Sequence, residues 1–190
     1  NPNILLLDKQ TGKVEWQHAL EKGEECNAVA LTKKGEILYS YKRGAKLVTW
    51  DHQVVWDYKT PDKTELQSAT LLQNGGVLLG ICGIPAQFIE LDKKGKEVNK
   101  VTLNLEVERP HSQFRQVFQL RNSNYLIPVM AKQKVLEVSR KGKIIAEHQI
   151  EGKAFSSLEL PNGNLLLPCG DNHYYIVIDR KTGKELKRVN

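Results

Sequence analysis

Cysteine is scarce in this sequence, whose 190 residues contain only Cys26, Cys82 and Cys169. Three cysteines cannot all pair within one chain, and none of them forms a CxxC spacing, so the sequence predicts no disulfide framework. We expect these residues to be small, buried apolar packing groups.

Long hydrophobic runs are also lacking. The longest apolar stretches, such as residues 77–81, are far short of the roughly 20 residues that a membrane helix needs. The N-terminal Asn-Pro-Asn has neither the basic start nor the apolar segment of a signal peptide, which predicts a cytosolic protein or a sequence without its signal. No segment has a sustained helical period, and no complete catalytic or metal-binding motif occurs. The sequence therefore predicts no membrane span, no metal and no cofactor.

What the sequence does contain is an internal repeat of about 43 residues. With 40% hydrophobic and 26% charged residues, the chain is in the range of a single globular unit. One pattern, an apolar strand end followed by a polar turn, occurs five times, as in ILLLDKQTGKVEW and YIVIDRKTGKEL. Its marker residues are Asp8, Asp51, Asp92, Ser139 and Asp179. A second pattern, such as LLQNGGVLLG or ELPNGNLLLP, lies between successive copies of the first.

Each pattern predicts a β-hairpin, because short β-branched or leucine-rich runs flank a turn of Gly, Asn or Lys-Gly. Two hairpins per repeat make four strands, which is the length and content of a β-propeller blade. We therefore predict an all-β propeller of four-stranded antiparallel blades. Residues 1–20 form an outer strand pair, and the blades occupy residues 21–60, 61–101, 102–148 and 149–190. Because this is not a whole number of blades, we expect the chain to be an incomplete arc of a longer one.

The repeat resembles that of the pyrroloquinoline-quinone-type propellers, in which an aspartate, a Thr-Gly-Lys turn and a tryptophan mark the outer hairpin. The match is complete at Asp8, Gly12 and Trp16, while the third to fifth copies have no tryptophan. The vicinal cysteines and calcium-binding acids of the quinoprotein enzymes are not found. The overall layout, including ERPHSQFRQ and PNGNLLLPCGD, is similar to uncharacterised exported propellers of Bacteroides-type bacteria. That resemblance implies a six-bladed ring and a periplasmic or cell-surface location, but no reaction.

Strand alternation sorts the loops onto two faces, with the strands of each blade labelled a to d outward from the axis. The ab and cd turns lie on one face, and the bc turns and da crossings lie on the other, because successive antiparallel strands reverse direction. The ab and cd turns, such as TKKGE and DKKGK, hold much of the positive charge of a chain with net charge +6. Lysine and glycine suit solvated hairpin turns, and no aromatic residues alternate with these lysines for base stacking. We therefore expect no nucleic-acid partner.

The longest da crossing holds ERPHSQFRQ, residues 108–116. Because rigid scaffolds carry their binding residues on variable loops, the sequence predicts a ligand site here, at the central funnel. The candidate residues of this crossing are Glu108, Arg109, His111, Gln113, Arg115 and Gln116.

Further candidates come from the innermost strands and the bc loops. Aligning the a strands on Leu31, Leu72, Leu120 and Leu160 gives one equivalent position to Asn27, Ser68, Gln116 and Ser156, which predicts a polar collar near the axis. These side chains could equally cap strand ends or bind channel water. Gln67 precedes the collar position, and a bc loop adds Asp171 and His173. A metal site built from Cys26, His111, Asp171 and His173 has no support from sequence spacing.

From these features we expect a non-catalytic binding or scaffold propeller, with a small anionic or saccharide ligand in the funnel; a protein partner is left open. The alternative is a lyase or transferase acting on an acidic or sulfated sugar. In that case Glu108, His111 and Arg115 would supply a base and two charged stabilisers.

Overall fold

The computed structural model describes residues 3–190, which fold into one hairpin and four four-stranded antiparallel sheets. The N-terminal hairpin pairs β1 (Asn3–Leu7) with β2 (Val14–Ala19). Blade 1 contains β3 (Cys26–Leu31), β4 (Ile37–Tyr41), β5 (Gly44–Val48) and β6 (Val54–Lys59). Blade 2 contains β7 (Glu65–Leu71), β8 (Val77–Cys82), β9 (Ala86–Leu91) and β10 (Glu97–Leu103).

Blades 3 and 4 have the same order, with shorter innermost strands. Blade 3 contains β11 (Phe118–Gln119), β12 (Tyr125–Val129), β13 (Lys134–Val138) and β14 (Ile144–Gln149). Blade 4 contains β15 (Leu158–Glu159), β16 (Leu165–Cys169), β17 (Tyr174–Ile178) and β18 (Glu185–Val189). The only helices within residues 3–190 are 3₁₀ turns of three residues, η1 (Pro110–Ser112), η2 (Met130–Lys132) and η3 (Gly170–Asn172). Among these described residues no helix is long and apolar enough to cross a membrane.

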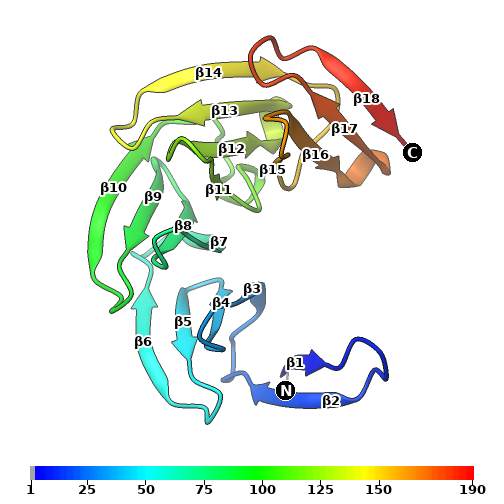
Figure 1. Cartoon of the computed structure of the whole chain (residues 1–190). Coiled ribbons are helices and arrows are strands. Elements are labelled where there is room, and N and C mark those ends of the chain that lie inside the picture. The colour runs from blue at the N-terminus through cyan, green and yellow to red at the C-terminus, as the bar shows by residue number, and fades with distance from the viewer. Residues whose placement is uncertain (1–2) are drawn as a thin grey trace.

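The blades are arranged side by side in an open arc, with their short inner strands toward the centre and their long d strands around the rim (Figure 1). This confirms the predicted arc of one strand pair and four full propeller blades. Two predicted boundaries fall inside strands, because β10 continues to Leu103 and β14 to Gln149. The b and c strands of blades 1 to 3 are almost entirely buried, whereas those of blade 4 are buried on one side only, and d strands such as β6 alternate between exposed and covered side chains.

The hydrophobic core lies between the blades. One cluster joins Leu47 and Trp56 of blade 1 to Val77 and Leu79 of blade 2. The other clusters join the hairpin to blade 1, blade 2 to blade 3, and blade 3 to blade 4 in the same way. Blades 1 to 3 therefore share the apolar side chains of both their faces with neighbours, which explains why their b and c strands are continuous apolar runs.

The marker residues of the repeat cap the cd turns. The Asp92 carboxylate accepts hydrogen bonds from the backbone N–H groups of Lys94 and Lys96, at 2.8 and 2.9 Å. Asp8 and Asp179 accept similar bonds in their own turns. In blade 1, however, the turn residue bonded like Asp92 is Thr49, so the prediction of Asp51 as the marker was wrong by two residues. A threonine hydroxyl can accept the same turn hydrogen bond as an aspartate carboxylate, so a repeat pattern based on aspartate misses Thr49.

A second link connects the rim strands of the hairpin, blade 2 and blade 3 to the blade that follows each of them. The indole N–H of Trp16 donates to the carbonyl of Trp50 at 2.7 Å. Further along the arc, where the repeat has no tryptophan, Asn99 donates to the Arg140 carbonyl at 3.1 Å and His148 bonds the Arg180 carbonyl at 2.7 Å. Different side chains therefore form the same contact between blades.

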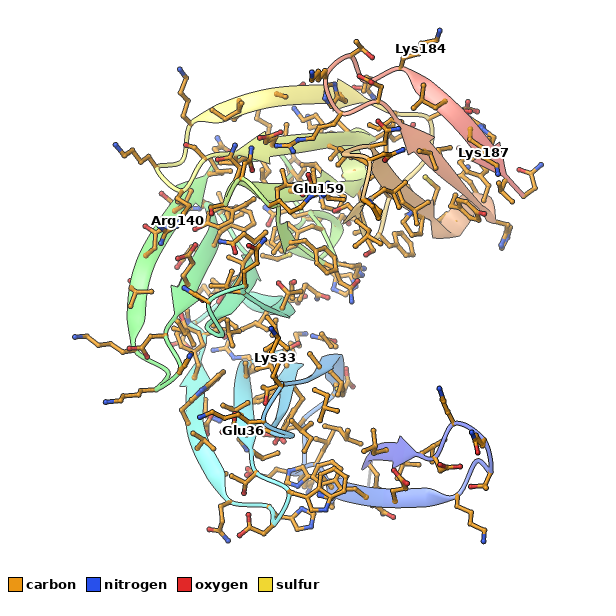
Figure 2. All side chains as sticks on the ribbon, viewed as in Figure 1. Lys33, Glu36, Arg140, Glu159, Lys184 and Lys187 are labelled. Carbon is orange, nitrogen blue, oxygen red and sulfur yellow. The ribbon has the colours of Figure 1, made fainter. Side chains whose placement is uncertain are left out.

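Ion pairs on the turn face form a third link. The guanidinium of Arg140, labelled in Figure 2, binds the buried carboxylate of Glu90 in the preceding blade, with nitrogen–oxygen distances of 2.9 and 2.5 Å. Arg180 binds the buried carboxylate of Glu137 in the same bidentate way, at 2.9 and 2.8 Å. Part of the positive charge of the turn face therefore holds blades together.

The three cysteines are all unpaired thiols. Cys82 and Cys169 are buried, as predicted, at the ends of equivalent b strands. Cys26 is exposed, so the prediction that it is a buried packing group was wrong. It is the first residue of β3, the innermost strand of blade 1, and its thiol lies 3.6 Å from the Ala28 carbonyl oxygen.

Candidate functional site

The buried polar side chain of Gln113 anchors the crossing from β10 to β11. Its amide oxygen accepts a hydrogen bond from the Gly83 N–H at 3.0 Å, and its amide nitrogen donates to the Gly83 carbonyl at 2.7 Å. Gln113 is 1% exposed, and its own carbonyl accepts a bond from the Met130 N–H. Gln113 therefore ties the crossing to the bc turn of blade 2. It was predicted to contact a ligand, but its amide oxygen and nitrogen are both already bonded to Gly83.

Upstream of this anchor, His111 meets a carboxylate from the preceding blade. Its Nδ1 lies 2.9 Å from Glu65 Oε2. Lys42 Nζ lies 3.3 Å from the other oxygen of Glu65, and the Gln67 amide donates to Oε2 at 3.2 Å. Burial opposes ionisation of Glu65, but the bonds from His111 and Lys42 outweigh it and lower the pKa of this carboxyl. The four side chains form a polar cluster that joins a bc loop, the start of an a strand and the long crossing.

Glu108, Arg109 and His111 line an open pocket of about 460 Å³ on the bc face. The opposite wall comes from the blade 1 bc loop and the crossing into blade 2. The residues of this wall are Lys42, Arg43, Lys63, Thr64 and Glu65. Four lysine or arginine side chains thus face two carboxylates, which gives the pocket a positive balance suited to an anion.

Arg115 has a different environment from the one predicted. Its guanidinium donates to the carbonyls of His111 and Phe114, at 2.5 and 3.3 Å, so it closes the turn of its own loop. The side chain is half-buried. Arg109 is the arginine of this crossing that lines the pocket.

The collar residues hold neighbouring blades together at the axis. Asn27 donates to the Leu66 carbonyl of blade 2 at 2.8 Å. The buried Ser68 hydroxyl accepts from the Val117 N–H of blade 3 at 3.0 Å. Ser156 and Gln116 are partly exposed, and the Gln116 N–H donates to the Phe155 carbonyl of blade 4. A polar collar is therefore present, but its bonds run mainly to the backbone of the next blade.

The alignment that defined the collar is shifted by one residue in blade 1. The ab turn begins at Thr32 there and at Leu72 in blade 2, as their bonds across the turn show. The residue equivalent to Ser68 is therefore Ala28, and Asn27 corresponds to Gln67, both at β-bulges. Aligning on the turn residues Gly35 and Gly75 would have given the correct register.

Asp171 and His173 lie in a separate part of the bc face. Asp171 is the middle residue of η3, and its carboxylate pairs with the Lys153 ammonium group at 3.0 Å. His173 ends the same 3₁₀ turn in the left-handed backbone region and donates its N–H to the Gly170 carbonyl. Within residues 3–190 no hydrogen bond or ion pair joins either side chain to His111. Within residues 3–190 no three His, Cys, Asp or Glu side chains converge as a metal site.

The lining residues between blades 1 and 2, among them Lys63 and Glu65, were not selected from the sequence. Lys63 lies in the short crossing from β6 to β7 and Glu65 is the first residue of β7, and this crossing has no unusual length that would mark it. The signal that could have identified them is topological, because this crossing opens onto the same face as ERPHSQFRQ in the adjacent blade.

Solved structures show what this arc is similar to. A protein of unknown function from Bacteroides caccae, whose crystal structure was determined at 1.35 Å resolution, shares 38% identity with a TM-score of 0.93, covering 99% of this chain and 69% of that one. A catalytically inactive virginiamycin B lyase from Staphylococcus aureus with quinupristin has a TM-score of 0.74 at 13% identity, covering 96% of this chain and 61% of that one. A streptogramin B lyase has a TM-score of 0.75 at 12% identity, covering 97% and 60%.

The two lyases share only the fold with this chain, and the chain spans about three fifths of their length. The Bacteroides structure agrees with the expected similarity to uncharacterised propellers of such bacteria. No curated protein matched the chain. A family model described as Mal s 1 allergenic protein-like matches residues 2–190, whereas the resemblance to quinone-type repeats stays a prediction. Because the match covers almost every residue, the chain belongs to the Mal s 1 allergenic protein-like family.

Proposed function

We propose that this chain is part of a non-catalytic binding propeller whose ligand is a small anionic or polyhydroxylated molecule, such as an acidic saccharide fragment. The observation that carries the proposal is the pocket of about 460 Å³ between the blade 1 bc loop and the long crossing. Its lysine and arginine side chains suit carboxylate or sulfate groups, and its two carboxylates and the Thr64 hydroxyl suit sugar hydroxyls.

A thermal-shift screen with uronic acids and sulfated sugars tests this proposal. We expect stabilisation by at least one acidic sugar and none by its neutral counterpart, with Arg109→Ala and Lys42→Ala each weakening binding about fivefold or more. Lys141→Ala, on the opposite face, is the matched control and should bind normally. Equal responses to acidic and neutral sugars, or full affinity in both pocket variants, would contradict the proposal.

The pairing of His111 with Glu65 supports a second candidate, a lyase or transferase acting on the same class of sugar. A carboxylate that fixes the tautomer of an exposed imidazole is a common arrangement for a general base. Product analysis after prolonged incubation separates the two candidates. A binding protein returns the sugar intact, whereas an enzyme consumes it and loses that activity in His111→Ala.

We also propose that the intact ring has six blades and that the protein is exported. The number of blades is supported by the eighteen strands seen here and by the 69% of the Bacteroides structure that the chain covers. A crystal structure of the longer chain would test the number of blades, and cell fractionation would test the location.

A further inference from the structure

A second candidate ligand site lies on the turn face, at the boundary between blades 1 and 2. A pocket of about 350 Å³ opens there, within the size range of small-molecule sites. Its apolar lining comes from Leu47 and Trp56 of blade 1 and from Leu72 and Val77 of blade 2. All four of these side chains are at least nine-tenths buried. This pocket lies on the opposite face from the one proposed for the saccharide, so the two proposals are independent.

Comparison of equivalent positions within the chain explains why the pocket exists. Glu90 and Glu137 each lie two residues before a cd turn, and Arg140 and Arg180 each follow the first residue of the next one. At the two later boundaries these residues form bidentate ion pairs that fill the space between blades. At the boundary of blades 1 and 2 the same positions hold Leu47 and Lys93. They cannot form the pair, and both line the pocket.

The tryptophan link is also absent at this boundary. Trp16 donates its indole N–H to the next blade, but the buried Nε1 of Trp56 has no hydrogen-bond partner among the described residues. The Trp56 ring packs on Gly95, where an added Cβ would lie 2.7 Å from the ring Cγ. The ion pair and the rim hydrogen bond that join the later blades are therefore both absent at this boundary, and the Trp56 ring lines the pocket in their place.

The rim of the pocket is cationic. It carries Lys33, Lys34 and Lys93, and Figure 2 labels Lys33 and Glu36 on blade 1. Within the described part of the chain no carboxylate lies at ion-pair distance from any of these three ammonium groups. The two carboxylates of the lining already accept hydrogen bonds from the chain, Asp92 from backbone N–H groups and Glu36 from the Thr32 hydroxyl. The rim is thus free to bind an anion.

We propose that this pocket binds a small apolar carboxylate, with its hydrocarbon or aromatic part against Leu47 and Trp56 and its carboxylate at the lysine rim. Burial of a ring against these apolar side chains supplies most of the affinity, since each exposed lysine contributes little. The rim lysines then select an acid over a neutral molecule of the same shape. A sugar lacks the apolar body, and a nucleic acid or protein surface is too large to enter 350 Å³.

Isothermal titration with phenylacetate and with its neutral counterpart phenylacetamide tests the proposal. We expect saturable binding of phenylacetate, and binding of phenylacetamide that is about fivefold weaker or more. Lys93→Ala should weaken phenylacetate about fivefold and should leave phenylacetamide unchanged. Lys143→Ala, in the cd turn of blade 3, is the matched control and should bind both as the unaltered chain does.

A double variant, Leu47→Glu with Lys93→Arg, recreates the ion pair of the later boundaries and should abolish binding by filling the pocket. Circular dichroism establishes whether this variant is folded, and if it is not, Lys93→Ala alone decides the result. The proposal is overturned if phenylacetate does not saturate at about 10 mM, a concentration that detects even weak binding. It is also overturned if the amide binds equally well, or if the folded double variant or Lys93→Ala keeps full affinity.

Discussion

At the scale of single residues, the Gln113 amide determines how the long crossing is held. It pairs with both backbone polar groups of one residue, the N–H and the C=O of Gly83, in a buried position. Gln113→Ala leaves those two groups without partners, so we expect the free energy of unfolding to fall by about 1–3 kcal/mol. Chemical denaturation measures this change. The control Gln73→Ala, in an exposed turn, should change stability by less than about 0.5 kcal/mol, and equal losses in both variants would show that the buried amide is unimportant.

A histidine pair makes stability depend on pH. The Nδ1 atoms of His18 and His52 lie 3.2 Å apart, which allows one shared proton but disfavours two charged rings. Burial, followed by the charge of His52, lowers the pKa of His18 below 6.5. Protonation therefore favours the unfolded chain. This contribution to stability is complete above about pH 6.5 and is lost as the pH falls through the lowered pKa.

We expect the melting temperature to be lower at pH 5 than at pH 7.5, and this difference to shrink in His18→Gln, which removes the titrating group. Thermal melts followed by circular dichroism at the two pH values measure both. An unchanged pH difference in His18→Gln would assign the effect to other groups.

At the scale of elements, the ion pair of Glu90 and Arg140 holds blade 2 to blade 3. Glu90 is 1% exposed, so removing Arg140 leaves a buried carboxylate with no cation beside it and only the Tyr125 hydroxyl as a hydrogen-bond donor. We expect Arg140→Ala to cost about 2–3 kcal/mol, discounted because the arginine itself is half exposed. The double variant Glu90→Leu with Arg140→Lys copies the Leu47 and Lys93 of the preceding boundary and should recover most of that loss. Urea denaturation distinguishes them, and a double variant as unstable as Arg140→Ala would contradict this account.

The strands and their order could be predicted from the sequence because apolar runs and turn residues recur at a regular spacing. The same regularity failed locally in blade 1, where Thr32 and Thr49 occupy positions that leucine and aspartate hold elsewhere. The alignment then followed Leu31 and Asp51. The roles of the crossing residues were beyond the sequence. The partner of Gln113 is the backbone of Gly83, 30 residues away, and Arg115 bonds its own loop. Composition identified the polar crossing but could not show which of its side chains were already bonded.

At the scale of the whole molecule, the basic turn face should bind nucleic acid poorly. Arg140 and Arg180 are engaged with buried glutamates, and the remaining lysines lie at hairpin tips on separate blades. We expect weak binding of single- or double-stranded DNA that disappears near physiological salt. Fluorescence anisotropy titrations at two salt concentrations measure it. Tight binding that persists in salt would make the turn face a nucleic-acid surface.

The location of the core between blades has a consequence for how this protein tolerates change. Because each apolar cluster belongs to two sheets, a blade removed from its neighbours would lose both of its packing surfaces at once. Local opening of one sheet weakens the two beside it, so cooperativity spreads from neighbour to neighbour along the arc. A substitution on the face of one blade must be compensated on the facing side of the next. The unit that a designer or natural selection can exchange is therefore the boundary between two blades, together with the half-blade on each side of it.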